Sequence, residues 1–190
     1  HKESMAIEID NKLAGYEVTK HLLDQGFRKI AHLTGNLLRN VYADRLAGYK
    51  EALRDYRIPF EEKRIFIGPL SENAGIRLAE NIIAMKDKER PDAVFAANDT
   101  SAVYCLLRLK EAGFRIPADI GFAGFNNDPV SQVVTPQLTT VQNPGYQMGE
   151  TAVNNLISHL KGNTDIKATP KIILRSELII RRSSLKKKTL

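Results

Sequence analysis

The sequence predicts an α/β fold built on a doubly wound parallel sheet. Segments with helical periodicity alternate along the chain with short apolar segments typical of buried strands, and glycine or proline separates many of them. The chain has 190 residues, 43% of them hydrophobic, which is enough for one or two domains with a real core. Because short strands joined by helices imply right-handed crossovers, helices are expected on both faces of the sheet.

The pattern predicts helices and strands in strict alternation, starting with a helix. The expected helices cover Ala14–Leu22, Leu46–Tyr56, Ile76–Ile83, Val103–Leu107 and Met148–Leu160. The first stops at Gly26, the second ends before Pro59, and Gly113 closes the fourth. The expected strands are Ile30–Leu33, Ile65–Ile67, Ala93–Ala97, Ile120–Phe125 and a β-rich segment, Ile172–Ile180. Internal repeats and low-complexity linkers are absent from the sequence.

Polar residues follow several of the predicted strands. They occur at Thr34-Gly35, Gly68-Pro69, Asn98-Asp99 and Asn126-Asn127-Asp128. Ligands of such sheets bind at the carboxyl ends of the strands, so these loops are the expected site. Asp99 and Thr100 are good helix N-caps, whereas the amide of Asn98 could offer both a donor and an acceptor to a ligand.

Arg45 is expected at the start of a helix. A positive charge is unfavourable at that end of the helix dipole. An anionic or polyhydroxylated ligand beyond the helix end would explain it, since arginine binds paired oxygens in a bidentate manner.

The net charge of +6 is concentrated at one end of the chain. Residues 165–190 contain eight basic and two acidic residues, and the rest is balanced. A run such as Lys186-Lys187-Lys188 is usually a solvated tail, so the basic pI is weak support for direct DNA binding. No run of about 18 apolar residues occurs, and no membrane span is expected.

No catalytic residue, metal or cofactor is predicted. Gly-x-Ser-x-Gly, Cys-x-x-Cys and phosphate-binding glycine loops are all absent from the sequence. The four histidines are scattered without metal-ligand spacing, and His32 is expected in the core. The single cysteine, Cys105, is expected as a buried thiol, consistent with a reducing, cytoplasmic location.

Six motifs in order resemble the regulatory domain of the LacI family of bacterial repressors. They are Gly26-Phe27-Arg28-Lys29-Ile30-Ala31, Arg45-Leu46-Ala47-Gly48-Tyr49, Ala96-Ala97-Asn98-Asp99, Gly113–Ile120, Gly124-Phe125 and Pro136–Val141. The resemblance covers residues 10 to 183. It implies a periplasmic-binding-protein-like fold of two lobes with the effector in the cleft between them.

The resemblance also implies a division of the chain. Residues 25–142 and 170–183 would be a nearly complete C-terminal lobe, and residues 1–24 and 143–169 would be remnants of the N-terminal lobe. Residues 184–190 would be a basic tail. The family's DNA-binding headpiece, hinge helix and first strands have no counterpart in this sequence.

Five effector-binding positions are implied by the resemblance. The family's effector arginine corresponds to Arg45 and its cleft asparagine to Asn98. Asn126 stands where the family often has an aspartate, which removes a charge that could accept sugar hydroxyls. Leu70 replaces a common aromatic platform, at a loss of about 1 kcal/mol of stacking. Arg39 lies where some members contact the ligand.

The function implied is effector sensing and dimerisation for a transcriptional regulator. The effector is expected to be a sugar or sugar derivative, and DNA would be bound only through the absent headpiece. A two-fold dimer is expected to use Val130, Val133 and Val134 in the loop after a strand, unless these valines pack onto their own lobe.

Two alternatives share the fold. One is the solute-binding protein of a sugar transporter. The motifs Ile116–Ile120 and Pro136–Val141 resemble those of repressors more than those of transporters and so favour a repressor. The other is an enzyme, which has only the fold in its favour, and fold alone does not establish function.

Overall fold

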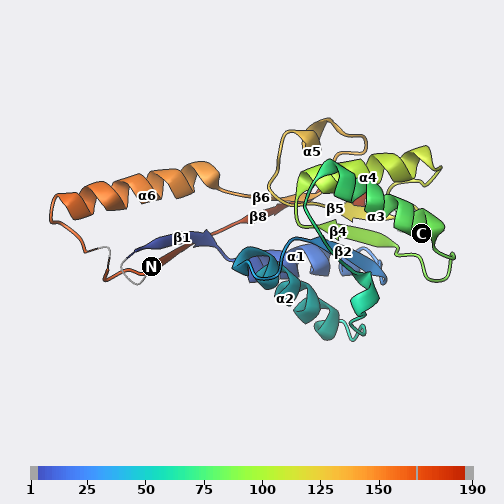
Figure 1. Ribbon diagram of the computed structural model, residues 1–190, viewed down its shortest axis with the longest axis horizontal. Coiled ribbons are helices and arrows are strands. Elements are labelled where there is room, and N and C mark those ends of the chain that lie inside the picture. Colours follow the sequence, from blue (N-terminus) through green and yellow to red (C-terminus); the bar gives the residue numbers. More distant parts are fainter. Residues whose placement is uncertain (1–3, 166, 187–190) are drawn as a thin grey trace. The chain divides into compact units, whose positions relative to one another are not determined.

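A computed structural model describes residues 4–165 and 167–186 (Figure 1). The chain forms two compact units. The larger comprises Asn11–Gln142 and Leu178–Leu190, and the smaller comprises His1–Asp10 and Asn143–Glu177.

The larger unit is built on a four-stranded parallel sheet with the order β3-β2-β4-β5. Its strands are β2 (Ile30–Thr34), β3 (Ile65–Ile67), β4 (Ala93–Ala96) and β5 (Gly121–Ala123). The chain leaves β2 for the outer strand β3 on one side and then returns to β4 on the other side. The topological switch point therefore lies between β2 and β4, where doubly wound sheets bind their ligands.

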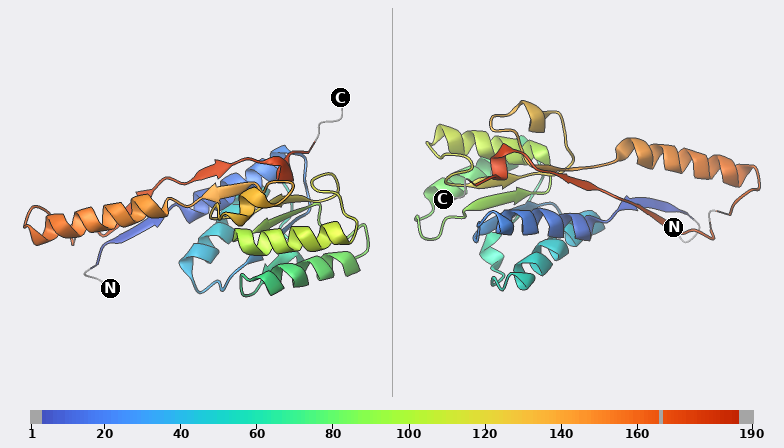
Figure 2. Two further views of the ribbon diagram at one scale, coloured as in Figure 1. Left: turned by 90° about the horizontal axis from the view of Figure 1, so that it is seen from above. Right: turned by 180° about the vertical axis from the view of Figure 1, so that it is seen from behind.

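Helices cover both faces of this sheet. Figures 1 and 2 show α1 (Asn11–Asp24) and α2 (Asn40–Asp55) on one face, with α3 (Glu72–Ala84) and α4 (Asp99–Glu111) on the other. Leu33 and Phe122 share a buried cluster with Leu106 on the α3 and α4 side, while His32 points to the α2 side. The predicted α/β, doubly wound architecture is confirmed.

Two predicted core residues are buried as expected. The ring of His32 stacks on Phe95 with centroids 4.5 Å apart and on Tyr49 at 5.3 Å. Burial lowers the pKa of His32 to about 4, so its imidazole is neutral. Cys105 is fully buried in the hydrophobic cluster that α3 and α4 form with the sheet. This burial raises the pKa of its thiol.

The segment after the sheet folds back onto the larger unit. Strand β6 (Thr140–Gln142) pairs with β8 (Glu177–Ile179), and a 3-10 helix, η2 (Arg182–Ser184), follows. Ser184, the first residue of the predicted basic tail, is buried and its Oγ lies 2.7 Å from Nε2 of His21. This residue is therefore part of the folded larger unit, and it is held there by a hydrogen bond to α1. Residues 187–190 of the predicted tail lie outside the described residues.

The smaller unit contains a two-stranded parallel sheet and one helix. Strand β1 (Ala6–Ile9) pairs with β7 (Lys171–Leu174), and α6 (Gly145–Leu160) contacts β1. The sequence pattern did not predict β1, a strand of four residues whose pairing partner is far along the chain. No residue of α6 is buried, and its Val153, Leu156 and Leu160 are exposed.

The two units divide the chain differently from the predicted lobes. Residues 11–24 were expected with the N-terminal remnants, but α1 packs against α2 and belongs to the larger unit. Residues 170–177 were expected with the C-terminal lobe, but β7 pairs with β1 and belongs to the smaller unit. Helix packing and strand pairing decide these boundaries, and neither leaves a local signal in the sequence. Among the described residues, no helix has the length and apolarity needed to cross a membrane.

Candidate functional site

The carboxyl edge of the four-stranded sheet carries a groove and a buried arginine. The groove encloses about 350 Å³ beyond the ends of β2 and β3 and is lined by Gly35, Asn36, Arg39, Tyr42, Ile67, Gly68, Pro69 and Leu70. Gly35 is required there, because a side chain at this position would collide with the ring of Tyr42. Tyr42 therefore packs close against the end of β2.

Arg45 spans the switch point of the sheet. It follows β2 in the chain, and its Nη1 donates a hydrogen bond to the carbonyl oxygen of Ala97, just after β4, at 2.8 Å. Its Nε donates to Oδ1 of Asn11 at 3.0 Å, and its Cζ lies 3.4 Å from the ring centroid of Phe125. The side chain is thus held by α1, by the end of β4 and by the residues after β5.

The position of Arg45 in its helix differs from the prediction. Helix α2 begins at Asn40, so Arg45 lies in its second turn and not at its start. The apolar stripe from Leu46 onward concealed the first turn, which is more exposed. The unfavourable interaction between a positive charge and the start of the helix dipole therefore does not arise for Arg45. This arginine is unusual because it is buried, with only 5% of its surface exposed.

Arg45 lacks a counter-ion in the described part of the chain. Of residues 4–165 and 167–186, none places a carboxylate oxygen within 4.0 Å of its guanidinium. Its contacts are an amide, a carbonyl and the rings of Phe125 and Tyr42. Burial without an opposite charge lowers the pKa of Arg45 to about 10, still far above neutral, so the group stays charged.

Asn98 is held by local hydrogen bonds at both ends of its amide. Its Oδ1 accepts from the backbone N–H of Ser101 at 3.1 Å and caps α4, and its Nδ2 donates to the carbonyl of Leu70 at 3.0 Å. The expectation that Asp99 or Thr100 caps this helix is wrong. Asn98 ties the loop after β3 to the start of α4 and so shapes one wall of the site.

Asp99 is instead a buried carboxylate that fastens the loop after β5. It is fully buried, and it accepts hydrogen bonds from Oγ1 of Thr140 at 2.6 Å and from the backbone N–H of Asp128 at 2.7 Å. Burial raises the pKa of Asp99 to about 7, although both hydrogen bonds favour the ionised form. The sequence signal for this role was weak, since an aspartate after a strand is usually a cap.

Asn126 and Asn127 form a strained turn after β5. Their φ angles are 108° and 57°, in the left-handed region that asparagine tolerates better than most residues. The backbone N–H of Asn126 donates to Val141 at 3.0 Å, and Oδ1 of Asn127 accepts from Arg181 at 2.7 Å. Nδ2 of Asn126 makes only a long hydrogen bond of 3.4 Å, to Asp128. The predicted turn is present, and its backbone is held from two sides.

The five candidate binding residues lie at the same edge of the sheet. Arg39 and Leu70 line the groove, and the carbonyl of Leu70 accepts from Asn98. Arg45 contacts Ala97 and Phe125, which directly precede Asn98 and Asn126. Three residues that hold Arg45 were not predicted from the sequence, namely Asn11, Tyr42 and Phe125. Contacts between distant segments identify Asn11 and Phe125, whereas Tyr42 lies one helical turn before Arg45 in α2.

The three candidate interface valines lie in different surroundings. Val130 and Val133 belong to a short helix, α5 (Val130–Val133), rather than to a loop. Val134 is 7% exposed and belongs to the core, and Val130 packs partly against the same core. Val133 is 80% exposed. Packing onto the larger unit's own core therefore accounts for Val130 and Val134 but not for Val133.

No group of three or more histidine, cysteine or acidic side chains arranged for a metal ion was found among the residues that the structure describes.

Comparisons with known proteins place the chain in a family. Residues 19–184 match the periplasmic binding protein-like domain. The chain is similar to the HTH-type transcriptional repressor PurR of Vibrio atlanticus, with 38% identity over 173 residues, which are 88% of this chain and 51% of that protein. The chain therefore spans about half the length of the curated relatives it matches.

Solved structures of transcriptional regulators also resemble this chain. The transcription regulator CcpA of Lactococcus lactis superimposes with a TM-score of 0.85 at 32% identity, covering 93% of this chain and 63% of that one. A complex of the transcriptional regulator CelR with cellobiose superimposes with a TM-score of 0.86 at 27% identity, covering 96% of this chain and 54% of that one. The chain thus belongs to the periplasmic binding protein-like family, in the form found in transcriptional regulators of the LacI type.

Proposed function

We propose that this chain is the effector-binding part of a LacI-type transcriptional regulator, and that a small molecule binds at the carboxyl edge of the larger unit's sheet. The observation that carries the proposal is the placement of Arg45. Its guanidinium lies at the switch point between β2 and β4, where doubly wound sheets bind ligands. The relatives support a regulator over a transport protein, because those named above are transcriptional regulators.

The effector is proposed to be a carbohydrate or a derivative of one. The cellobiose bound to CelR supports this class. The effector is proposed to be surrounded in this chain by Arg45, Asn98, Asn126, Leu70 and Arg39. Arg45 would be the principal hydrogen-bond donor. Regulation would follow if the effector binds one conformation of the protein more tightly than another and so shifts their populations.

The units are proposed to correspond to the family's lobes. The larger would be the C-terminal lobe, and the smaller would be part of the N-terminal lobe. We also propose that the regulator acts in the cytoplasm. It is further proposed to pair as a homodimer through the surface around Val133, since two half-sites on DNA require two-fold symmetry.

The experiment is a reporter assay with the complete gene product. Candidate effectors are first chosen by a thermal-shift screen against sugars, sugar acids and nucleosides. Arg45→Ala should then abolish the response to the effector while leaving DNA binding intact in a gel-shift assay. Arg54→Ala, which removes an exposed arginine from the same helix, serves as the control. An unchanged response in Arg45→Ala would exclude Arg45 from the site.

A further inference from the structure

The turn after β5 connects two features of the proposed function. It begins at Asn126, a proposed effector contact, and it leads through Asn127 into α5, whose exposed Val133 is the proposed pairing surface. Both asparagines have positive φ angles, 108° and 57°. A backbone in such a conformation persists only where the surrounding contacts hold it. The residues that hold this turn are therefore placed to link the effector-binding edge to α5.

Arg181 binds the turn and α5 at the same time. Its Nη2 donates a hydrogen bond to Oδ1 of Asn127 at 2.7 Å, and its Nη1 donates to Oγ of Ser131, in α5, at 3.0 Å. Nη1 also donates to the carbonyl oxygen of Leu138, in the segment after α5, at 2.9 Å. Because the guanidinium is planar and its N–H groups have a fixed geometry, it holds these three partners in one arrangement.

Contacts on both sides fix the position of Arg181 and of the turn. The backbone N–H of Arg181 donates to Oγ1 of Thr139 at 2.8 Å, and its carbonyl oxygen accepts from the same hydroxyl at 2.9 Å. On the other side of the turn, the side chain of Asp99 accepts from the backbone N–H of Asp128 at 2.7 Å. The turn is thus clamped between two side chains. Hydrogen bonds from a charged guanidinium are stronger than neutral ones, so the contacts of Arg181 are the firmer link to α5.

A direct contact between the turn and α5 is weaker. Oγ of Ser131 lies 3.4 Å from Oδ1 of Asn127, which is long for a hydrogen bond, and it donates to the carbonyl oxygen of Asp128 at 2.7 Å. A hydroxyl has a single proton to donate, and the shorter contact takes it. Arg181 is therefore the main connection between the side chain of Asn127 and α5.

We infer that Arg181 couples the turn that carries Asn126 to α5, so that a change at the effector-binding edge reaches the surface around Val133. The inference rests on the proposed function, and Arg181 is a positioning residue that does not itself need to touch the effector. A displacement of Asn127 would turn the plane of the guanidinium, because its two terminal nitrogens are rigidly joined. The hydrogen bonds of Nη1 would then lengthen, and α5 would follow the turn.

Hydrogen exchange in the complete gene product tests this coupling without an effector. Exchange is followed by mass spectrometry over residues 130–138, where the backbone N–H groups of Ser131 and Leu138 form hydrogen bonds. Arg181→Met and Asn127→Ala should each raise exchange there several-fold, because each breaks the connection between the turn and α5. The double variant should exchange no faster than Arg181→Met alone. Such non-additivity is the direct sign of a coupling that runs through Arg181.

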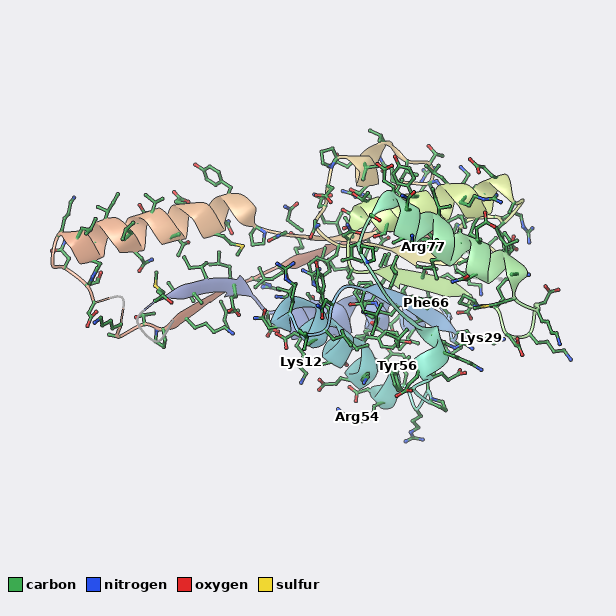
Figure 3. All side chains as sticks on the ribbon, viewed as in Figure 1. Lys12, Lys29, Arg54, Tyr56, Phe66 and Arg77 are labelled. Atoms are coloured by element: carbon green, nitrogen blue, oxygen red, sulfur yellow. The ribbon has the colours of Figure 1, made fainter. Side chains whose placement is uncertain are left out.

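Control variants separate this coupling from a general loss of stability. Arg182→Met, next to Arg181, and Arg54→Met, on α2 and labelled in Figure 3, each remove an exposed arginine and should leave the exchange unchanged. Arg181→Lys keeps the charge but lacks the planar fork that holds both partners, so it should behave like Arg181→Met and replaces it if that variant does not fold. If Asn127→Ala raises exchange equally with and without Arg181, or has no effect in its presence, the inference is overturned.

Sedimentation of the complete gene product supplies a second readout. Arg181→Met should weaken dimerisation about 10-fold in Kd, whereas Arg54→Met should leave it unchanged. Dimerisation as tight in Arg181→Met as in the wild type would refute the transmission to the surface around Val133. A wild type that stays monomeric would contradict the proposed pairing surface, and the exchange experiment would then decide the coupling. A failure of the proposed effector site would appear in the reporter assay instead, as a response that Arg45→Ala leaves unchanged.

Discussion

The contact between α1 and α2 depends on two glycines, and Gly48→Ala tests this directly. A methyl group on Gly48 would collide with the backbone of Lys12 and Tyr16 in α1. The reciprocal contact involves Gly15, whose added methyl group would meet the backbone of Arg45. Backbone cannot move aside as a flexible side chain can, so the two helices would have to separate.

The magnitude follows from two opposed effects. Alanine in place of glycine in a helix gains about 1 kcal/mol of intrinsic helix stability. Inserting a carbon into a tightly packed contact costs roughly 1–3 kcal/mol, and contacts with backbone lie at the upper end. Gly48→Ala should therefore lower the free energy of unfolding by about 1–2 kcal/mol. Because Arg45 belongs to the same contact, the effector response should weaken as well.

Urea unfolding followed by far-UV circular dichroism measures the effect, with Gly149→Ala as the control. Gly149 lies in α6, where an added methyl group has nothing within 4 Å. That variant should be neutral or stabilising by up to about 1 kcal/mol. If Gly48→Ala is as stable as Gly149→Ala, the close approach of α1 and α2 is not as described.

Three further predictions concern buried groups and the exposed valine. Burial raises the pKa of Asp99 from 3.8 to about 7, so its contribution to stability is full below about pH 4 and is lost as the pH rises through 7. Asp99→Asn should therefore flatten the pH dependence of the free energy of unfolding over that range, and an unchanged slope would contradict it. Val133→Glu should shift sedimentation toward the monomer and make Tm independent of protein concentration, because dimerisation no longer stabilises the folded state. Val134→Ala should cost about 1 kcal/mol and leave the oligomer intact. A Val133→Glu protein that still dimerises would move the interface elsewhere. Cys105 should resist a thiol reagent until the protein unfolds, because its thiol is buried and its pKa is raised; rapid labelling of the folded protein would refute its burial.

Local sequence signals were sufficient for most of the larger unit. Alternating helical and strand patterns predicted β2 to β5 and the helices between them, because burial of one helix face or of a whole strand imposes its own periodicity. Glycines after α1 and α4 also marked helix ends, and the structure gives Gly26 and Gly113 the positive φ of 90° that such ends require. The candidate site followed from the same pattern, since parallel strands bring their carboxyl ends to one edge.

What the sequence determined by itself was therefore the alternation of elements, the edge of the sheet where polar residues gather and, through its motifs, the family. The tertiary structure alone decided that β1 pairs with β7, that Asn98 caps α4 while Asp99 is buried, and that Arg45 is held by Asn11 and Phe125 without a carboxylate. The physical reason is the distance along the chain over which each effect acts. Periodicity and turn preferences act over a few residues, whereas strand pairing, desolvation and charge balance depend on segments that are far apart in the chain and meet only in the folded protein.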